Sequence, residues 1–290
     1  MPKPQRGRDT DPKPLKTKEV AVAAADDFGW EKIIKAAELV RLRPLTNKDV
    51  GLAASKTFNL MLNVAAQARF EDRLYTIPKR DIRRSHKSNE HIEDILIELQ
   101  STLYETEVKS PRGRPARLKT PLVSTTVDEI DDADDSLLYF RFTPELLKLY
   151  GSSTQYAELH GPTLIKFDSV YALRLYEIGR QMVGRKHPRM RLTVPELREL
   201  LRVPAGVYRD WTDLYRKTIG KAVAEVNQLA DFVVVMPPNE VKRSGRKVVS
   251  IELQFWEKPG LDAAQAASER QRHSAGRRAR RTNSVEDIAE

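Results

Sequence analysis

In the first half of the chain, some segments have apolar residues at helical spacing. The segments between them have apolar residues that alternate with polar ones, which is typical of strands. A run such as the one from Val50 to about Phe70 places leucine, alanine and methionine three and four residues apart, which predicts a helix with one buried face. In chain order, the predicted elements are helices at 27–42, 50–70, 78–85 and 89–103, with a strand at 74–77. Strands follow at 103–108, 122–127 and 137–142, before a helix at 143–149. The order of three helices and a hairpin is that of a winged helix-turn-helix.

The same order repeats in the second half. Asp168 or Ser169 caps a predicted helix that continues through Ile178, and Leu192-Thr193 is a short strand leading into a helix at 194–201, with Pro195 in its first turn. A turn at 203–210 precedes a helix at 211–229, and strands follow at 232–236 and 248–255. The predicted fold class is α+β, with two tandem winged helix-turn-helix domains.

The segments outside these patterns define the domain limits. Residues 1–26 are expected to be a disordered tail, residues 27–157 the first winged-helix domain and residues 158–256 the second. Residues 257–290, rich in Ala, Gln, Ser, Glu and Arg, are expected to be a disordered basic tail that holds at most a short helix.

Composition narrows the functional classes. The formal net charge is +9, and cysteine is absent, which excludes disulfides and thiolate metal sites. No apolar run of about 18 residues occurs, so a soluble, cytoplasmic protein without a membrane partner is expected. Residues 160–256 hold 17 basic and 10 acidic residues, and therefore most of the excess positive charge. A polyanion is expected to bind there.

The helix predicted at 211–229 has two distinct faces. A helical wheel collects an apolar core face from Trp211, Leu214, Tyr215, Thr218, Ala222, Val226 and Leu229. The opposite face shows Asp213, Arg216, Lys217, Gly220, Lys221, Ala224 and Gln228, and Arg209 and Thr212 lie at the start. Basic groups pair with guanine edges or phosphates, and small residues allow close approach to a groove. An ordinary solvated helix face is the alternative interpretation.

The loop between the last two strands is the expected wing. Its tip, residues 242–247, surrounds Gly245 with four cations, Lys242, Arg243, Arg246 and Lys247. Such a tip suits contact with phosphates, and the alternative is a loop kept polar for solubility.

The first domain differs, because its third helix is acidic. Basic residues precede that helix, and we expect them to contact the DNA backbone: Lys79, Arg80, Arg83, Arg84 and Lys87. In the alternative, the acidic helix faces solvent or a partner and the domain mainly dimerises. The first hairpin tip contains Arg112-Gly113-Arg114, followed by Arg117, and resembles the core of an AT-hook that enters a narrow A·T minor groove. A plain basic linker explains these residues equally well.

Catalytic and metal motifs are missing from the sequence. Residues 179–186, GRQMVGRK, lack the Lys-Ser/Thr pair of a phosphate loop. The five histidines form no metal-binding pair, and the acidic run Asp128–Asp135 lacks the turn glycine and closing glutamate of a calcium loop. No enzyme activity, cofactor or metal is expected.

Several runs in the second domain resemble a known family. These are Phe167–Glu177, Leu192–Arg198, Val203-Pro204 with Tyr208, and Lys221–Asn227. They are similar to the initiator Rep proteins of iteron-containing plasmids. The resemblance covers about residues 45–256 and is specific in the second domain, whereas in the first it lies in the order of elements. Gly220-Lys221 departs from the family pattern, as do the Arg-rich first hairpin and the basic C-terminal tail.

The resemblance implies that the protein initiates plasmid replication. The second domain would read double-stranded DNA in the major groove of repeated origin sites, called iterons. The first domain would contact the other end of each site and form a homodimer that represses its own operator. Monomers would promote opening of an A·T-rich region and recruit the host initiator and replicative helicase. Two such elements cover a site of roughly 20 base pairs. The apolar strands at 122–127 and 137–142 are expected to pair edge to edge in the dimer.

Two other classes of protein remain to be weighed. A stand-alone transcriptional repressor needs the same DNA surface, so the sequence does not separate it from a replication initiator. A nicking initiator of the rolling-circle type needs a pair of metal-binding histidines and a nucleophilic tyrosine. The sequence shows no such histidine pair, and its tyrosines fall mostly at core positions.

Overall fold

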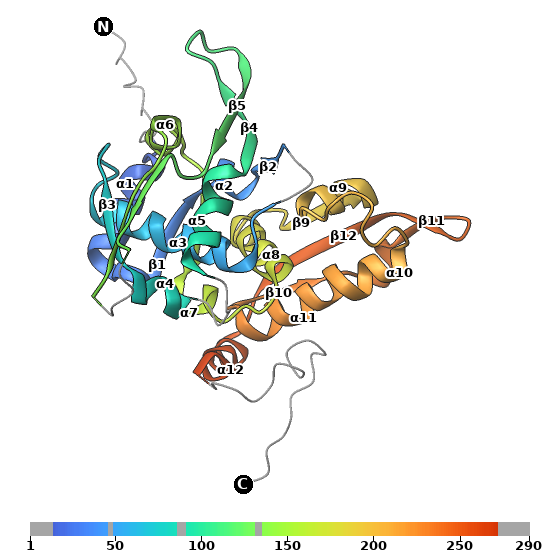
Figure 1. Ribbon diagram of the computed structural model, residues 1–290. Coiled ribbons are helices and arrows are strands. Elements are labelled where there is room, and N and C mark those ends of the chain that lie inside the picture. Colours follow the sequence, from blue (N-terminus) through green and yellow to red (C-terminus); the bar gives the residue numbers. More distant parts are fainter. Residues whose placement is uncertain (1–13, 46–48, 86–90, 131–134, 272–290) are drawn as a thin grey trace, which may run out of the picture.

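The computed structural model describes residues 14–45, 49–85, 91–130 and 135–271, which form two mixed helix-and-sheet units side by side (Figure 1). The helices are α1 (Thr17–Phe28), α2 (Ala37–Val40), α3 (Leu52–Gln67), α4 (Lys79–Ser85), α5 (Ile92–Ser101), α6 (Pro144–Ser152), α7 (Gly161–Leu164), α8 (Val170–Met182), α9 (Val194–Leu200), α10 (Trp211–Leu214), α11 (Gly220–Leu229) and α12 (Gly260–Gln271). The strands are β1 (Lys32–Ala36), β2 (Arg43–Pro44), β3 (Tyr75–Pro78), β4 (Leu103–Lys109), β5 (Pro115–Pro121), β6 (Thr125–Asp128), β7 (Leu137–Arg141), β8 (Tyr156–His160), β9 (Arg189–Thr193), β10 (Phe232–Val235), β11 (Lys242–Ser244) and β12 (Lys247–Glu257). Short helical turns are η1 (Gly29–Glu31), η2 (Tyr215–Ile219) and η3 (Pro238–Glu240).

The second unit has the winged-helix arrangement that its sequence predicts. The helices α8, α9 and α10–η2–α11 are followed by an antiparallel sheet in which β12 lies between β10 and β11 and also pairs with β9. The chain enters α8 at Ser169, whose hydroxyl accepts a hydrogen bond from the Ala172 amide (3.4 Å). At the start of α9, Thr193 and Glu196 cap each other's backbone in a capping box. These predicted helix starts are confirmed.

The first unit repeats this plan with insertions. Helices α3, α4 and α5 take the order of the three winged-helix helices, and β3, β7 and β6 form an antiparallel sheet with β7 in the centre. The pairing of β3 with β7 corresponds to that of β9 with β12. A small β1–β8 sheet and a separate β2–β4–β5 sheet complete the unit.

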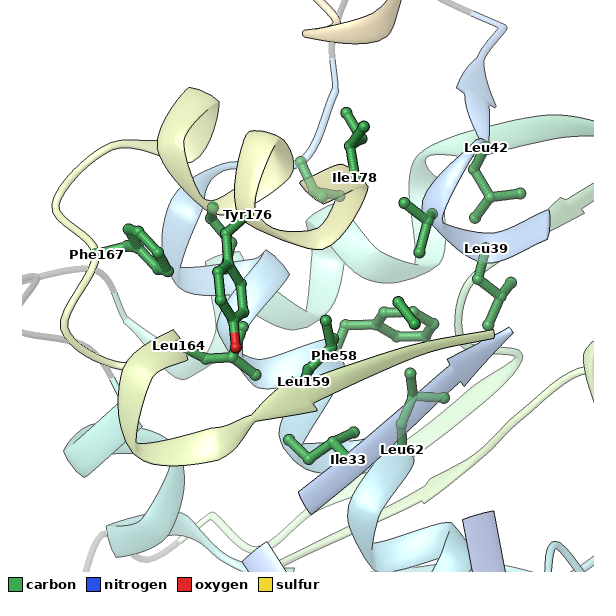
Figure 2. Packing of buried hydrophobic residues seen from close by; sticks show 14 of the residues in the cluster. Ile33, Leu39, Leu42, Phe58, Leu62, Leu159, Leu164, Phe167, Tyr176 and Ile178 are labelled. Atoms are coloured by element: carbon green, nitrogen blue, oxygen red, sulfur yellow. The ribbon is translucent and has the colours of Figure 1, made fainter. Parts of the chain in front are cut away.

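One hydrophobic core spans both units. Figure 2 shows Ile33 of β1, Phe58 of α3 and Leu159 of β8 in the same cluster as Tyr176 and Ile178 of α8. Gly179 lets this helix approach the sheet of its own unit, because a Cβ there would lie 2.3 Å from the Phe232 ring. Helix α8 therefore packs on both units, and the division at residues 157 and 158 stays a prediction.

The helix predicted from Asp27 to Leu42 is wrong. Helix α1 occupies Thr17–Phe28 and ends at Gly29 (φ +54°), so much of the predicted N-terminal tail is ordered structure. Ala21, Ala24 and Ala25 are buried in the core. The following apolar residues form β1, which pairs with β8, far along the chain: Lys32 is opposite His160 and Ala36 is opposite Tyr156. Long-range strand pairing, which local periodicity does not detect, overrides the helical pattern.

The assignment of the first wing also changes. The Arg-rich segment at 109–120 is largely strand: β4 and β5 form a hairpin that pairs with β2 in a sheet of its own. The strands placed like a wing are β6 and β7, and their connection is the acidic run after Asp128, of which residues 131–134 lie outside the described structure. Of the two strands predicted to pair edge to edge in a dimer, β6 lies at a sheet edge and β7 is central, and the dimer itself stays a prediction.

Other predicted features fall where expected or beyond the described residues. The short helix allowed in the C-terminal tail is α12. The first two residues of the helix predicted at 89–103 lie outside the described structure. In the described ranges, none of the helices has the length and apolarity needed to cross a membrane.

Candidate nucleic-acid interface

The helix at 211–229 contains an irregular turn. Asp210 caps its start by accepting a hydrogen bond from the Asp213 amide (2.8 Å). From Tyr215 to Ile219 the backbone forms a π turn, η2, which closes with a bond from the Gly220 amide to the Tyr215 carbonyl. A Cβ at Gly220 would lie 3.0 Å from that carbonyl oxygen, so glycine suits this position. Single π turns inside helices are frequent at functional sites.

The π turn alters the predicted faces. Leu214, Thr218, Ala222, Val226 and Leu229 are buried as expected. The predicted core residue Tyr215 is 42 % exposed, and Ala224, which was predicted to face outward, is buried. The wheel assumes 100° for every residue, and a turn that is one residue wider breaks this spacing.

The outward face keeps its cations. Arg216, Lys217 and Lys221 are exposed, with Thr212 and Arg209 exposed nearby. The Asp213 carboxylate lies 2.8 Å from Arg216 Nη2 and orients that guanidinium. The Lys217 ammonium lies 5.3 Å from the centre of the Tyr208 ring, in cation–π range. The helix therefore presents a row of exposed cations outside the core, which is the chemistry needed to bind phosphates or base edges.

Arg198 holds the turn that leads into this helix. Its guanidinium donates hydrogen bonds to three carbonyl oxygens, those of Val207 (2.6 Å), Tyr208 (2.9 Å) and Pro204 (3.0 Å). Tyr208 has a positive φ of 51°, which is unfavourable for a bulky side chain. The Arg198 guanidinium thus holds a strained turn in place and thereby fixes the start of the helix at 211–229.

The wing of the second unit is the β11–β12 hairpin, which projects from the body of the molecule (Figure 1). Gly245 takes the left-handed conformation that the tight turn requires (φ +58°). Lys242, Arg243, Arg246 and Lys247 are all exposed. The wing and the helix at 211–229 belong to one unit and together offer a cationic surface.

The basic helix of the first unit is less uniform than predicted. Lys79 is buried, with its ammonium 2.7 Å from the Asp128 carboxylate, and so it is wrongly included among the DNA contacts. Arg80 and Arg84 are exposed, and Arg83 is partly buried. Lys87 lies outside the described structure. A strand-helix junction at Pro78 turns the Lys79 side chain inward, which the run of cations did not reveal.

The acidic helix α5 occupies the position of a recognition helix in the first unit. Glu93 and Asp94 are exposed, whereas Glu98 accepts a hydrogen bond from the Gly51 amide (2.8 Å) and caps the start of α3. The connection between β6 and β7 is acidic as well. In this unit, therefore, both the helix in the recognition position and the connection in the wing position carry negative charge. Their counterparts in the second unit carry positive charge.

The β4–β5 hairpin carries its arginines at the tip. Arg112 and Arg114 are exposed and flank Gly113 (φ +76°), whose amide donates to the Ser110 carbonyl oxygen (2.8 Å). The Arg-Gly-Arg segment is thus folded as a turn in this structure and not extended. Arg117 lies further down the hairpin, 3.7 Å from Glu105. The minor-groove interpretation stays a prediction.

Sequence reasoning missed a buried ionic cluster between the units. Asp49 contacts both Arg174 and Arg202, and the Tyr104 hydroxyl donates to the same carboxylate. Burial lowers the pKa of Arg174 to about 10 and raises that of Tyr104. A signal was present in the sequence, because Arg174 interrupts an otherwise apolar helical run.

Within the described parts of the chain, no group of three or more His, Asp or Glu side chains is arranged to hold a metal ion.

Two winged-helix units, the second with a cationic helix and wing, define a DNA-binding protein. Two family models match the chain: Initiator Replication protein, WH1, over residues 32–180, and Initiator Rep protein, WH2, over residues 193–255. The chain belongs to the initiator Rep protein family of replication initiators. The WH1 match continues through most of α8, in keeping with the packing of that helix on both units.

A crystal structure of domains 2 and 3 of RctB has a TM-score of 0.42 and 14 % sequence identity, covering 79 % of this chain and 87 % of that one. No curated protein matches the chain.

Proposed function

We propose that the protein initiates replication of a bacterial plasmid by binding directly repeated iterons at the origin. The observation that supports this most is the cationic helix at 211–229, whose turn is fixed by Arg198 and whose neighbour is a four-cation wing, in a chain of the initiator Rep family. The second unit supplies sequence specificity through Arg216, Lys217 and Lys221. Phosphates are held by Arg209 and the wing.

The first unit contacts a second segment of the same DNA site. Arg80, Arg83 and Arg84 on α4 contact backbone phosphates and not bases. The acidic α5 does not enter a groove, because its carboxylates would face the phosphates. Binding by the chain promotes opening of an A·T-rich region, after which the host initiator and the replicative helicase are recruited.

Dimerisation is the proposed control on this cycle. The free edge of β6 pairs with its copy in a second chain, and the resulting homodimer represses the operator of its own gene. Val127 of this strand is 50 % exposed, which suits a contact with a second copy. Sedimentation over micromolar concentrations is expected to show a monomer–dimer equilibrium that Val127→Lys shifts toward monomer; a chain that is monomeric throughout would contradict the proposal.

Footprinting on the plasmid region beside the gene tests the proposed DNA binding. The wild-type chain is expected to protect directly repeated segments of roughly 20 base pairs. The triple variant Arg216→Ala, Lys217→Ala, Lys221→Ala is expected to protect none of them. Absence of protected direct repeats with the wild-type chain would overturn iteron binding.

A replication assay separates an initiator from a stand-alone repressor. A minimal plasmid holding the protected region is expected to replicate only when the gene is supplied, and not with the triple variant. Replication that is independent of the gene, together with repression of its promoter, would instead identify a repressor.

A further inference from the structure

Asp49 lies at the junction of the two winged-helix units. It precedes α3 of the first unit, and its Oδ2 contacts the Arg174 guanidinium from α8 and Nη1 of Arg202 (3.4 Å) from the turn after α9. The side chains of Asp49, Arg174 and Arg202 are only 6 %, 7 % and 10 % exposed. One carboxylate therefore pairs with two guanidinium groups that the second unit buries against the first.

The cluster is bonded to the backbone of both units. Arg174 donates to the carbonyl oxygen of Leu201 (2.8 Å) in the second unit and to that of Val50 (3.2 Å) in the first. Arg202 lies 5.5 Å from the centre of the Tyr104 ring and donates to the Val40 carbonyl oxygen (3.4 Å). These directional bonds favour one arrangement of the units, because each guanidinium must reach carboxylate and carbonyl oxygens at fixed positions.

Arg202 also connects this cluster to the DNA-reading element. It has a positive φ of 54° and begins the turn that Arg198 holds and that ends at the helix at 211–229. A shift of Arg202 relative to Asp49 would therefore change the direction in which that helix leaves the body of the molecule.

A second set of buried contacts holds α8 against the first unit. Lys35 of β1 lies 2.8 Å from Glu177, and Asn59 of α3 donates to the same oxygen (2.9 Å). Gln181 donates to the Ala37 carbonyl oxygen (3.3 Å). These contacts hold the C-terminal half of α8, whereas Arg174 lies in its N-terminal half. Asp49 therefore acts on the remaining freedom, the angle of the helix-turn-helix against α3.

We propose that Asp49, acting through Arg174 and Arg202, is a positioning residue that sets the angle between the two winged-helix units and thereby fixes the separation of the two DNA segments bound by one chain. The effect on the DNA separation rests on the proposed function, in which both units contact DNA. The effect on the angle between the units concerns the protein alone. Buried ionic groups are suited to this role, because their best-attested contribution is to specify one arrangement and not to add stability.

A distance measurement on the free protein tests the angle. The chain has no cysteine, so Ser101→Cys and Val249→Cys place one label on each unit without further changes. Spin labels at these exposed positions are expected to give one narrow distance distribution. Asp49→Asn keeps the shape of the side chain but removes its charge, and is expected to broaden the distribution at least twofold. A width equal to that of the parent chain would overturn the proposal.

Control variants separate positioning from stability. Glu199→Gln removes an exposed ion pair between the units, Arg43–Glu199 (2.6 Å), and is expected to leave the distribution unchanged. Tyr104→Phe removes the hydroxyl that donates to Asp49 and accepts from the Val50 amide (3.4 Å), and is expected to broaden the distribution slightly. If Asp49→Asn fails to fold, Arg202→Gln replaces it, since Arg174 still neutralises Asp49. An unchanged width in both Arg202→Gln and Tyr104→Phe would then overturn the proposal.

Selection from a pool of randomised DNA duplexes tests the DNA spacing. Wild-type protein is expected to select two conserved blocks at one separation, and Asp49→Asn is expected to select the same blocks at two or more separations. One identical separation with both proteins would overturn the spacing role. If the wild-type protein selects a single block, then the first unit makes no sequence-dependent DNA contact, and the spacing role is overturned as well. The widths of the spin-label distance distributions still decide whether Asp49 sets the angle between the units.

Discussion

Lys79 and Asp128 form an ion pair inside the first winged-helix unit, with the ammonium 2.7 Å from the carboxylate. Lys79 also donates to the carbonyl oxygen of Glu129. The residue therefore ties the start of α4 to the end of β6, beside the acidic connection that occupies the wing position. A cation in a basic run is here part of the core, whereas its neighbours Arg80 and Arg84 are exposed.

This contact predicts that replacing Lys79 lowers the stability of the protein, whereas replacing the nearby Arg84 lowers its DNA affinity. Lys79→Met leaves Asp128 without its partner, but that carboxylate is 37 % exposed and remains hydrated, so we expect a loss of about 1–3 kcal/mol in the free energy of unfolding. DNA affinity per folded molecule is expected to stay within about twofold. Arg84→Ala is the matched control, and it is expected to lower the DNA affinity but to leave the free energy of unfolding unchanged. Urea unfolding and fluorescence anisotropy measure the two quantities; a large loss of affinity in folded Lys79→Met would contradict this assignment.

Salt dependence distinguishes phosphate contacts from a merely solvated helix face. Each phosphate neutralised contributes about −0.9 to the slope of log affinity against log salt. Removing Arg216, Lys217 and Lys221 together is expected to reduce this slope by up to about 3 units. Anisotropy titrations between 50 and 300 mM salt, on the order of the range where this effect is large, provide the measurement. An unchanged slope would show that this face does not bind DNA.

The three carbonyl contacts of Arg198 predict a graded series of variants. Arg198→Ala removes every donor and is expected to destabilise the second unit by about 1–3 kcal/mol, and to weaken DNA binding about tenfold through a displaced helix. Arg198→Lys keeps the charge but lacks the planar fork, so an intermediate effect is expected. If the two variants bind DNA equally well, the turn does not depend on this geometry. Glu199→Ala, on the same helix, serves as the control.

The second unit could be predicted from sequence because its signals are local. Thr193, Pro195 and Glu196 mark the start of α9, and a single Gly245 marks the wing turn. In the first unit, β1 depends on pairing with β8, and β5 depends on pairing with β4, so residue spacing alone missed them. Local periodicity carries no information about a partner strand far along the chain.

The candidate site was predictable to the extent that its residues are exposed. Arg216 and Lys217 lie where the helical wheel places them, because outward cations are typical of a DNA-binding face. Lys79 and Asp49 were misread or missed, since burial of a charge depends on a partner from another element. The exposure of Tyr215 follows from a π turn, which has no clear sequence signature apart from Gly220.

Buried tyrosines predict sensitivity to alkaline pH. Burial raises the pKa of Tyr75 to about 12 and also raises the pKa values of Tyr104 and Tyr150. The unfolded chain releases these protons near pH 10, so the stability they contribute is complete below about pH 10 and falls as the pH rises through the folded pKa values. Absorbance of phenolate at alkaline pH is expected to show fewer than the 9 tyrosines titrating before unfolding. All nine titrating in the folded protein would contradict this expectation.

The β4–β5 hairpin predicts a sequence-dependent contribution to DNA affinity. Arg112 and Arg114 project from a turn at the tip and are free of the core. A narrow A·T minor groove concentrates negative potential and attracts guanidinium groups more strongly than a wide one. Replacing both arginines by alanine is therefore expected to lower affinity for duplexes with an A·T-rich flank at least threefold more than for those with a G·C-rich flank. Anisotropy on the two duplexes measures this ratio, with Lys109→Ala on the same hairpin as the control. Equal losses on both flanks would leave only a general phosphate contact.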